Sequence, residues 1–158
     1  MSTQGCLMCE MEGAAEEVVI FRDELWACEI LPGYEVPGWV VLRARRHAVG
    51  WTGLDEAELN SFGHRARAVD GALKRVTHAP ATYVMIFGEA YPHFHALMVA
   101  RGVDVPPERR TGDILKLRAE WADPARAHQL LPGLRAAYTD LAQAGDLDTI
   151  PTHWRSQR

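Results

Sequence analysis

Two histidines alternate with apolar residues in segment 92–101, and this alternation constrains the fold more than any other feature of the chain. The segment reads Pro-His-Phe-His-Ala-Leu-Met-Val-Ala-Arg. In a strand, side chains two positions apart face the same side of the sheet. His93 and His95 are therefore predicted to project together, whereas Phe94 and Ala96 face a core. Because imidazole can act as nucleophile, acid–base group or metal ligand near neutral pH, the pair predicts a functional site.

Four other segments have the apolar, β-branched and aromatic composition of strands, namely 17–22, 25–30, 38–44 and 83–87. One long amphipathic segment predicts a helix. It follows Asp55, which forms a capping-box pattern with Glu58, and its apolar stripe continues to Val76. Together with the histidine strand, these elements predict an α+β fold: a five-stranded antiparallel sheet with a long flanking helix and a helical C-terminal extension.

The chain of 158 residues is long enough for one domain with a substantial core. We expect residues 1–101 to form the core of the domain and residues 102–158 to form a C-terminal extension packed on it. The extension begins with a proline-rich loop at 103–110 and continues into a helix-prone segment at 125–144 that Pro132 and Gly133 interrupt. The last residues, 150–158, are expected to be loosely held.

Composition excludes several classes of function. The formal net charge of −4 gives no electrostatic basis for binding a nucleic-acid polymer. The N-terminus lacks the charged and apolar regions of a signal peptide, and no apolar stretch reaches the ~20 residues of a membrane helix. We therefore expect a cytoplasmic protein without membrane contact, in which the three cysteines are reduced.

Cys6 and Cys9 form a C-x-x-C pair, whose two thiolates are spaced to bind one metal ion. His47, at the end of a predicted strand, and His93, at the start of another, could complete a tetrahedral Cys2His2 zinc site. The alternative is that Cys6 and Cys9 are ordinary reduced thiols in a mobile terminus. For His95 the alternative to a functional role is a core histidine that bonds to a backbone carbonyl.

The segment from Pro92 to Arg101 resembles the signature of the histidine-triad superfamily, in which histidines alternate with apolar residues between a proline and an arginine. The resemblance covers about the first 101 residues. Further matching segments, in order along the chain, are Cys6-Leu7-Met8-Cys9, Phe21-Arg22-Asp23, Pro32, Pro37-Gly38-Trp39-Val40-Val41-Leu42 and Arg45-Arg46-His47-Ala48.

The resemblance implies a homodimer and an enzyme that hydrolyses or transfers a nucleotidyl group from a small nucleotide-type substrate. Suitable substrates are nucleoside phosphoramidates, dinucleoside polyphosphates and nucleotide sugars. The middle histidine of the signature, His95 here, is implied to attack the α-phosphorus and form a covalent nucleotidyl-histidine.

The zinc-bearing branch of the superfamily, which includes galactose-1-phosphate uridylyltransferase, binds structural zinc through residues that match Cys6, Cys9, His47 and His93. Glu29 matches an acidic residue that bonds the ribose hydroxyls in many members. Three further residues, Glu89, Tyr91 and Arg101, are expected to shape the substrate pocket.

The chain departs from the family pattern at three places. Leu97 occupies the third histidine position, and leucine can neither donate a hydrogen bond nor protonate a leaving group. The phosphate loop is shortened to residues 88–92 and contains Glu89, and Trp39 replaces a substrate-side histidine of several members. These departures favour an alternative function: a divergent, zinc-stabilised module that binds a ligand or partner without phosphoryl chemistry. A third alternative is an enzyme for a non-nucleotide substrate, with Glu89 as acid–base group.

Overall fold

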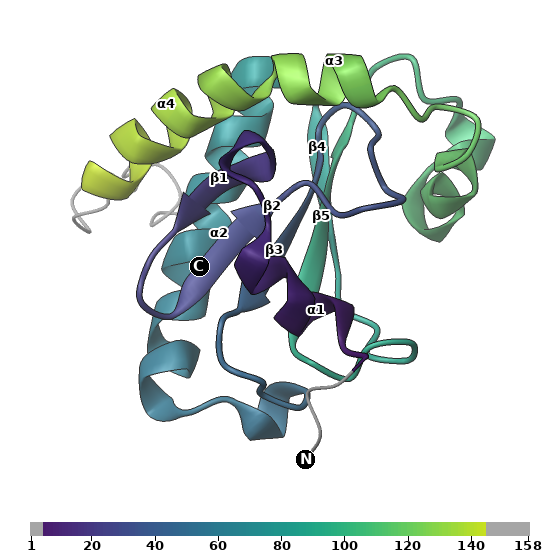
Figure 1. Cartoon of the computed structure of the whole chain (residues 1–158). Coiled ribbons are helices and arrows are strands. Elements are labelled where there is room, and N and C mark those ends of the chain that lie inside the picture. The colour runs from purple at the N-terminus through teal and green to yellow at the C-terminus, as the bar shows by residue number, and fades with distance from the viewer. Residues whose placement is uncertain (1–4, 145–158) are drawn as a thin grey trace, which may run out of the picture.

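The computed structural model describes residues 5–144 (Figure 1). A five-stranded antiparallel sheet has the strand order β1-β2-β3-β5-β4. The strands are β1 (Val19–Arg22), β2 (Trp26–Glu29), β3 (Trp39–Ala44), β4 (Ala81–Met85) and β5 (His95–Arg101). Each overlaps a strand predicted from the sequence. The predicted α+β class with an antiparallel sheet is therefore confirmed.

Within residues 5–144, four α-helices accompany the sheet: α1 (Leu7–Glu10), α2 (Glu56–Thr77), α3 (Pro124–Gln129) and α4 (Leu131–Gln143). Short 3-10 turns lie between them: η1 (Met11–Gly13), η2 (Glu16–Val18), η3 (Trp51–Gly53), η4 (Pro107–Arg109) and η5 (Thr111–Leu117). The predicted interruption at Pro132 and Gly133 is displaced: the break between α3 and α4 falls at Leu130, and both residues lie inside α4, where Pro132 in the first turn costs no hydrogen bond.

The prediction of irregular structure throughout 103–110 was too simple, because η4 lies within that segment. The predicted loose terminus at 150–158 lies outside the described residues. No helix in the part of the chain that the structure describes is both long and apolar enough to cross a membrane.

Helix α2 begins with the predicted capping box. The Asp55 side chain accepts a hydrogen bond from the Glu58 backbone N–H at 2.9 Å, and the Glu58 carboxylate accepts one from the Asp55 N–H at 2.8 Å. Glu58 is almost fully buried and also accepts from Arg46 at 2.6 Å. The start of α2 is thus fixed to the segment that follows β3.

The sheet has two covered faces. Alternate strand residues such as Val40, Leu42 and Met98 pack with α2 and α4 in the main core. On the other face, α1 and η5 cover the remaining strand residues, which include Val41 and Val99 (Figure 1). Helix α4 thereby connects the C-terminal extension to the main core, and the proposed boundary at 101/102 remains a prediction.

Replacing Asp55 with alanine should lower the free energy of unfolding by about 1 kcal/mol, because the first turn of α2 loses its side-chain acceptor. Urea denaturation measures this change. Glu56→Ala is the matched control, because Glu56 is an exposed residue of the same turn. Equal destabilisation by both substitutions would contradict the capping role.

Candidate metal centre and the adjacent cavity

His47 and His93 come together because strand pairing continues beyond the ends of β3 and β5. The Phe94 N–H donates to the Ala48 carbonyl at 2.7 Å, and the Ala44 N–H donates to the Phe94 carbonyl at 3.1 Å. An isolated bridge pairs Val49 with His93. The two imidazole rings consequently lie edge to face, with their centroids 5.0 Å apart.

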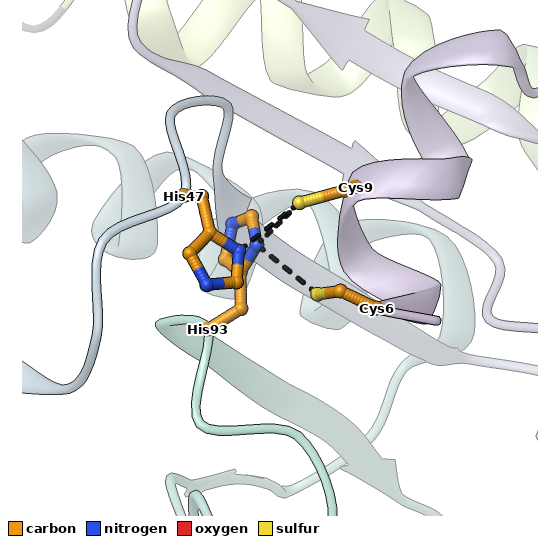
Figure 2. A group of neighbouring side chains, drawn as sticks. All are labelled: Cys6, Cys9, His47 and His93. Atoms are coloured by element: carbon orange, nitrogen blue, oxygen red, sulfur yellow. Dashed lines mark hydrogen bonds between the residues drawn. The ribbon is translucent and has the colours of Figure 1, made fainter. Parts of the chain in front are cut away.

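The two cysteines lie at the start of α1 and within it. The Cys6 carbonyl accepts hydrogen bonds from the N–H groups of Cys9 and Glu10, each at 3.0 Å, which closes a helical turn. Residues three apart in such a turn lie on one side of the helix, so both thiols face the histidines (Figure 2). The cysteine pair is therefore held in a folded turn.

The four side chains bring their ligand atoms within 4.8 Å of one another (Figure 2). Nδ1 of His93 lies 3.5 Å from Sγ of Cys6 and 3.3 Å from Sγ of Cys9, and Nδ1 of His47 lies 3.1 Å from Sγ of Cys9. Tetrahedral zinc, with its usual bond lengths to sulfur and nitrogen, would place two such ligand atoms about 3.5 Å apart. The cluster fits that geometry.

A hydrogen bond outside the cluster sets the orientation of His93. Its Nε2–H donates to the Ala44 carbonyl at 2.7 Å, which leaves Nδ1 as the lone-pair nitrogen that faces the thiols. His93 is fully buried, and this burial lowers its pKa, so the ring is held in the neutral form that binds metal. The four residues thus form a structural zinc site of the Cys2His2 class.

Burial, together with the hydrogen bond and the charge of Cys6, raises the pKa of Cys9 to about 11. In the metal-free protein, the Cys9 thiol is consequently protonated at neutral pH. Zinc binding must displace this proton, because the thiolate is the form that ligates metal.

His95 lies at the start of β5, two residues beyond His93, and is half-buried. Its Nδ1 bonds to the backbone carbonyl of His93 at 2.7 Å. A carbonyl oxygen only accepts, so Nδ1 carries the hydrogen and Nε2 keeps its lone pair. The two histidines therefore differ: His93 presents Nδ1 to the thiols, whereas the lone pair of His95 is on Nε2.

His95 lines a cavity of about 180 Å³ on the sheet face that η5 covers. The wall is mostly apolar or aromatic, and Glu89 is its one acidic or basic residue besides His95. The predicted pocket residues Glu89 and Tyr91 both line it. The full lining is Leu31, Tyr34, Met85, Phe87, Gly88, Glu89, Ala90, Tyr91, His95, Leu97 and Leu115.

Two predicted substrate-binding residues lie elsewhere. Glu29 is fully buried, and its carboxylate accepts hydrogen bonds from Arg43 and Arg22, so contact with a ribose would require these ion pairs to open. Arg101 is at the far end of β5, about 20 Å from His95 at the usual rise per strand residue. Neither residue lines the His95 cavity.

Two of the three departures from the family pattern lie in one apolar cluster. Trp39 and Leu97 are both buried there with Val99, and the η5 residues Ile114 and Leu117 close the cluster. No sequence pattern indicated that η5 packs here or that Leu115 lines the cavity. Arg43 was also missed, because it reads as the charged end of a strand although it is fully buried.

Metal analysis of the purified protein should find one zinc ion per chain, and chelation should lower the melting temperature, because the free energy of metal binding adds to that of folding. Cys9→Ser should abolish stoichiometric zinc. Cys28→Ala is the control, because Cys28 is a buried thiol in the main core and not in the cluster. Equal zinc content in all three proteins would exclude the site.

Zinc binding at pH 7 should release protons, because the pKa of the Cys9 thiol is raised to about 11. Zinc affinity should therefore increase with pH, about tenfold per pH unit for each thiol proton displaced. Calorimetry in buffers of different ionisation enthalpy counts these protons. Binding without proton release would show that Cys9 does not ligate as a thiolate.

Neither a scan against protein-family models nor a search of curated proteins finds a match to this chain. Solved structures do match. A zinc-bound histidine-triad family protein from Mycobacterium smegmatis is 23% identical, with a TM-score of 0.64 over 90% of this chain and 99% of that one. A hypothetical histidine-triad nucleotide-binding protein from Sulfolobus tokodaii is 18% identical, with a TM-score of 0.69 over 90% and 98%.

A uridylyltransferase also matches, at 17% identity and a TM-score of 0.65; the match covers 85% of this chain but only 46% of that one. The chain thus spans about half the length of this enzyme. These similarities agree with the five-stranded antiparallel sheet and flanking helices described above. In its fold, the chain is a histidine-triad-like protein.

Proposed function

We propose that this protein hydrolyses or transfers a nucleotidyl group from a nucleoside phosphoramidate or dinucleoside polyphosphate, with His95 as nucleophile. The hydrogen bond from His95 Nδ1 to the His93 carbonyl, at 2.7 Å, is the observation that carries the proposal. In the neutral ring, this bond places the hydrogen on Nδ1 and leaves the Nε2 lone pair available beside a cavity. The nucleotide-binding protein and the uridylyltransferase among the similar structures support nucleotide chemistry.

The reaction has two displacement steps. Nε2 of His95 forms a bond to the α-phosphorus, while the bond from phosphorus to the leaving-group nitrogen or oxygen breaks. Water, or another acceptor, then attacks the phosphorus of the nucleotidyl-histidine, and the bond to Nε2 breaks. A nucleoside monophosphate or a transferred nucleotide leaves, and the neutral imidazole is regenerated.

The charge of the cavity favours one of the two substrate classes. Glu89 is anionic, and neither lysine nor arginine is among the lining residues that the structure describes. A polyphosphate leaving group carries several negative charges and would meet repulsion without compensation. A departing amine is neutral or cationic, and it takes its proton from water because Leu97 has none to give. Phosphoramidates are therefore the preferred substrates within the proposal.

A His95→Asn variant should fold and bind zinc normally but form no covalent nucleotide adduct, because the nucleophilic nitrogen is absent. Incubation with nucleoside phosphoramidates and dinucleoside polyphosphates, followed by intact-mass spectrometry, measures the adduct. We expect the unmodified chain to gain the mass of one nucleotidyl group, with more adduct from the phosphoramidate. His64→Asn is the matched control, since His64 is an exposed residue of α2.

An adduct that persists in His95→Asn would exclude His95 as the nucleophile. Turnover of either substrate without an adduct in the unmodified chain would instead indicate direct attack by water. That result would favour the acid–base role of Glu89 considered above.

One observation favours the second candidate function, a zinc-stabilised binding module without phosphoryl chemistry. Leu97 and Trp39 place an apolar cluster where polar groups would assist phosphoryl transfer. If neither substrate gives an adduct or turnover, this cluster and the largely apolar cavity favour a ligand with a substantial apolar surface.

The homodimer and the cytoplasmic location are further proposals. Strand β4 is an edge strand of the sheet, and it exposes Val84 at its centre and is followed by the exposed Phe87. Pairing of two copies along this edge would cover these side chains and the unpaired backbone groups.

A further inference from the structure

A network of ion pairs connects the cysteine-bearing arm, residues 6–13, to the sheet beneath it. Arg43 on β3 is fully buried and donates to both carboxylate oxygens of Glu29 on β2, at 2.8 and 2.9 Å. Its Nη1 donates to Glu12 of the arm at 3.2 Å. Arg45 also binds Glu12, with hydrogen bonds of 3.0 and 3.2 Å to the two carboxylate oxygens. Glu12 is thus held by two arginines from the same part of the sheet.

A second connection comes from β1. Arg22 donates to Glu29 at 2.9 Å and to the backbone carbonyl of Met11 in the arm at 3.3 Å. Glu29 therefore binds two arginines, Arg22 and Arg43, and each of them also reaches the arm. The buried carboxylate links the arm to three strands of the sheet.

The arm needs such connections because its own secondary structure is weak. Helix α1 has only four residues, far fewer than an isolated helix needs for stability. Its buried side chains, including Met8 and Met11, belong to a small apolar cluster with Leu31 and Val41. Polar contacts through Glu12 and the Met11 carbonyl therefore determine much of where the arm lies.

A gain in the free energy of folding does not explain why Arg43 and Glu29 form a buried ion pair. Both side chains are fully buried, and the cost of removing two charges from water largely offsets their attraction. A bidentate ion pair does, however, fix the direction of the guanidinium, and here it points Nη1 at Glu12. The geometry therefore accounts for the pair better as an orienting device.

We propose that Glu12, with Arg43 and Arg45, positions the arm so that the thiols of Cys6 and Cys9 occupy their ligand positions before zinc binds. Glu12 follows Cys9 by three residues, so a displacement at Glu12 is transmitted to the cysteine pair through one turn of backbone. Residues that orient metal ligands from outside the ligand set commonly change metal affinity 10- to 100-fold when they are replaced.

Zinc affinity, measured by competition with a chromophoric chelator, tests the proposal. Glu12→Gln keeps the shape of the side chain but removes its charge, and should weaken zinc binding about 10- to 100-fold. Arg45→Met should weaken it less, because the contact from Arg43 to Glu12 remains. Glu10→Gln is the matched control: Glu10 is an exposed residue of the same arm, and within residues 5–144 its side chain forms no ion pair.

Two further measurements separate positioning from a general loss of stability. The metal-free Glu12→Gln variant should melt close to the metal-free unmodified protein, because the Glu12 side chain is 34% exposed and such ion pairs add little stability. Saturation with cobalt should give the thiolate charge-transfer bands of the unmodified protein, because the same four ligands bind.

Three results would overturn the proposal. Unchanged zinc affinity in Glu12→Gln would show that the network does not position the thiols. Equal weakening in Glu10→Gln would indicate a general effect of charge on the arm. A metal-free Glu12→Gln protein that unfolds at a much lower temperature would assign the weakening to loss of the fold.

Discussion

The structure depends on the register in which β3 pairs with β5. This antiparallel pairing sets Arg43 opposite His95 and Val41 opposite Leu97. Its continuation beyond the strand ends brings His47 beside His93. A slip of one residue would move every side chain of β5 to the other face, so the zinc ligands and the nucleophile candidate would both be lost. One set of backbone hydrogen bonds thus positions the metal centre and the cavity.

His93 and His95 present different ring nitrogens because their hydrogen bonds differ. His93 donates through Nε2 to the Ala44 carbonyl, which leaves Nδ1 for metal. His95 donates through Nδ1 to the His93 carbonyl, which leaves Nε2 beside the cavity. His95 does bond to a backbone carbonyl, as the alternative interpretation expected, and its role as a nucleophile stays a prediction.

Glu29 matches the acidic residue of the family pattern in sequence, but its neighbours in the structure differ from those that the resemblance implied. The resemblance implied a ribose contact, yet the buried Arg43 lies on the neighbouring strand and binds both of its oxygens. Cross-strand neighbours cannot be inferred from one segment, because they depend on the pairing of segments distant in the sequence. Leu115 is a similar case: the composition of 103–117 did not indicate that η5 would cover the sheet and line the cavity.

The sequence by itself determined the local elements: alternation predicted the strands, the Asp55 and Glu58 pattern predicted the start of α2, and the C-x-x-C spacing indicated a metal ligand pair. These features depend on residues a few positions apart, and short-range geometry is enough to predict them. Only the tertiary structure decided that the four zinc ligands converge, that arginine side chains bind the buried Glu29 and that His95 lines a cavity. These facts depend on contacts between residues far apart in the chain, which register and packing set together.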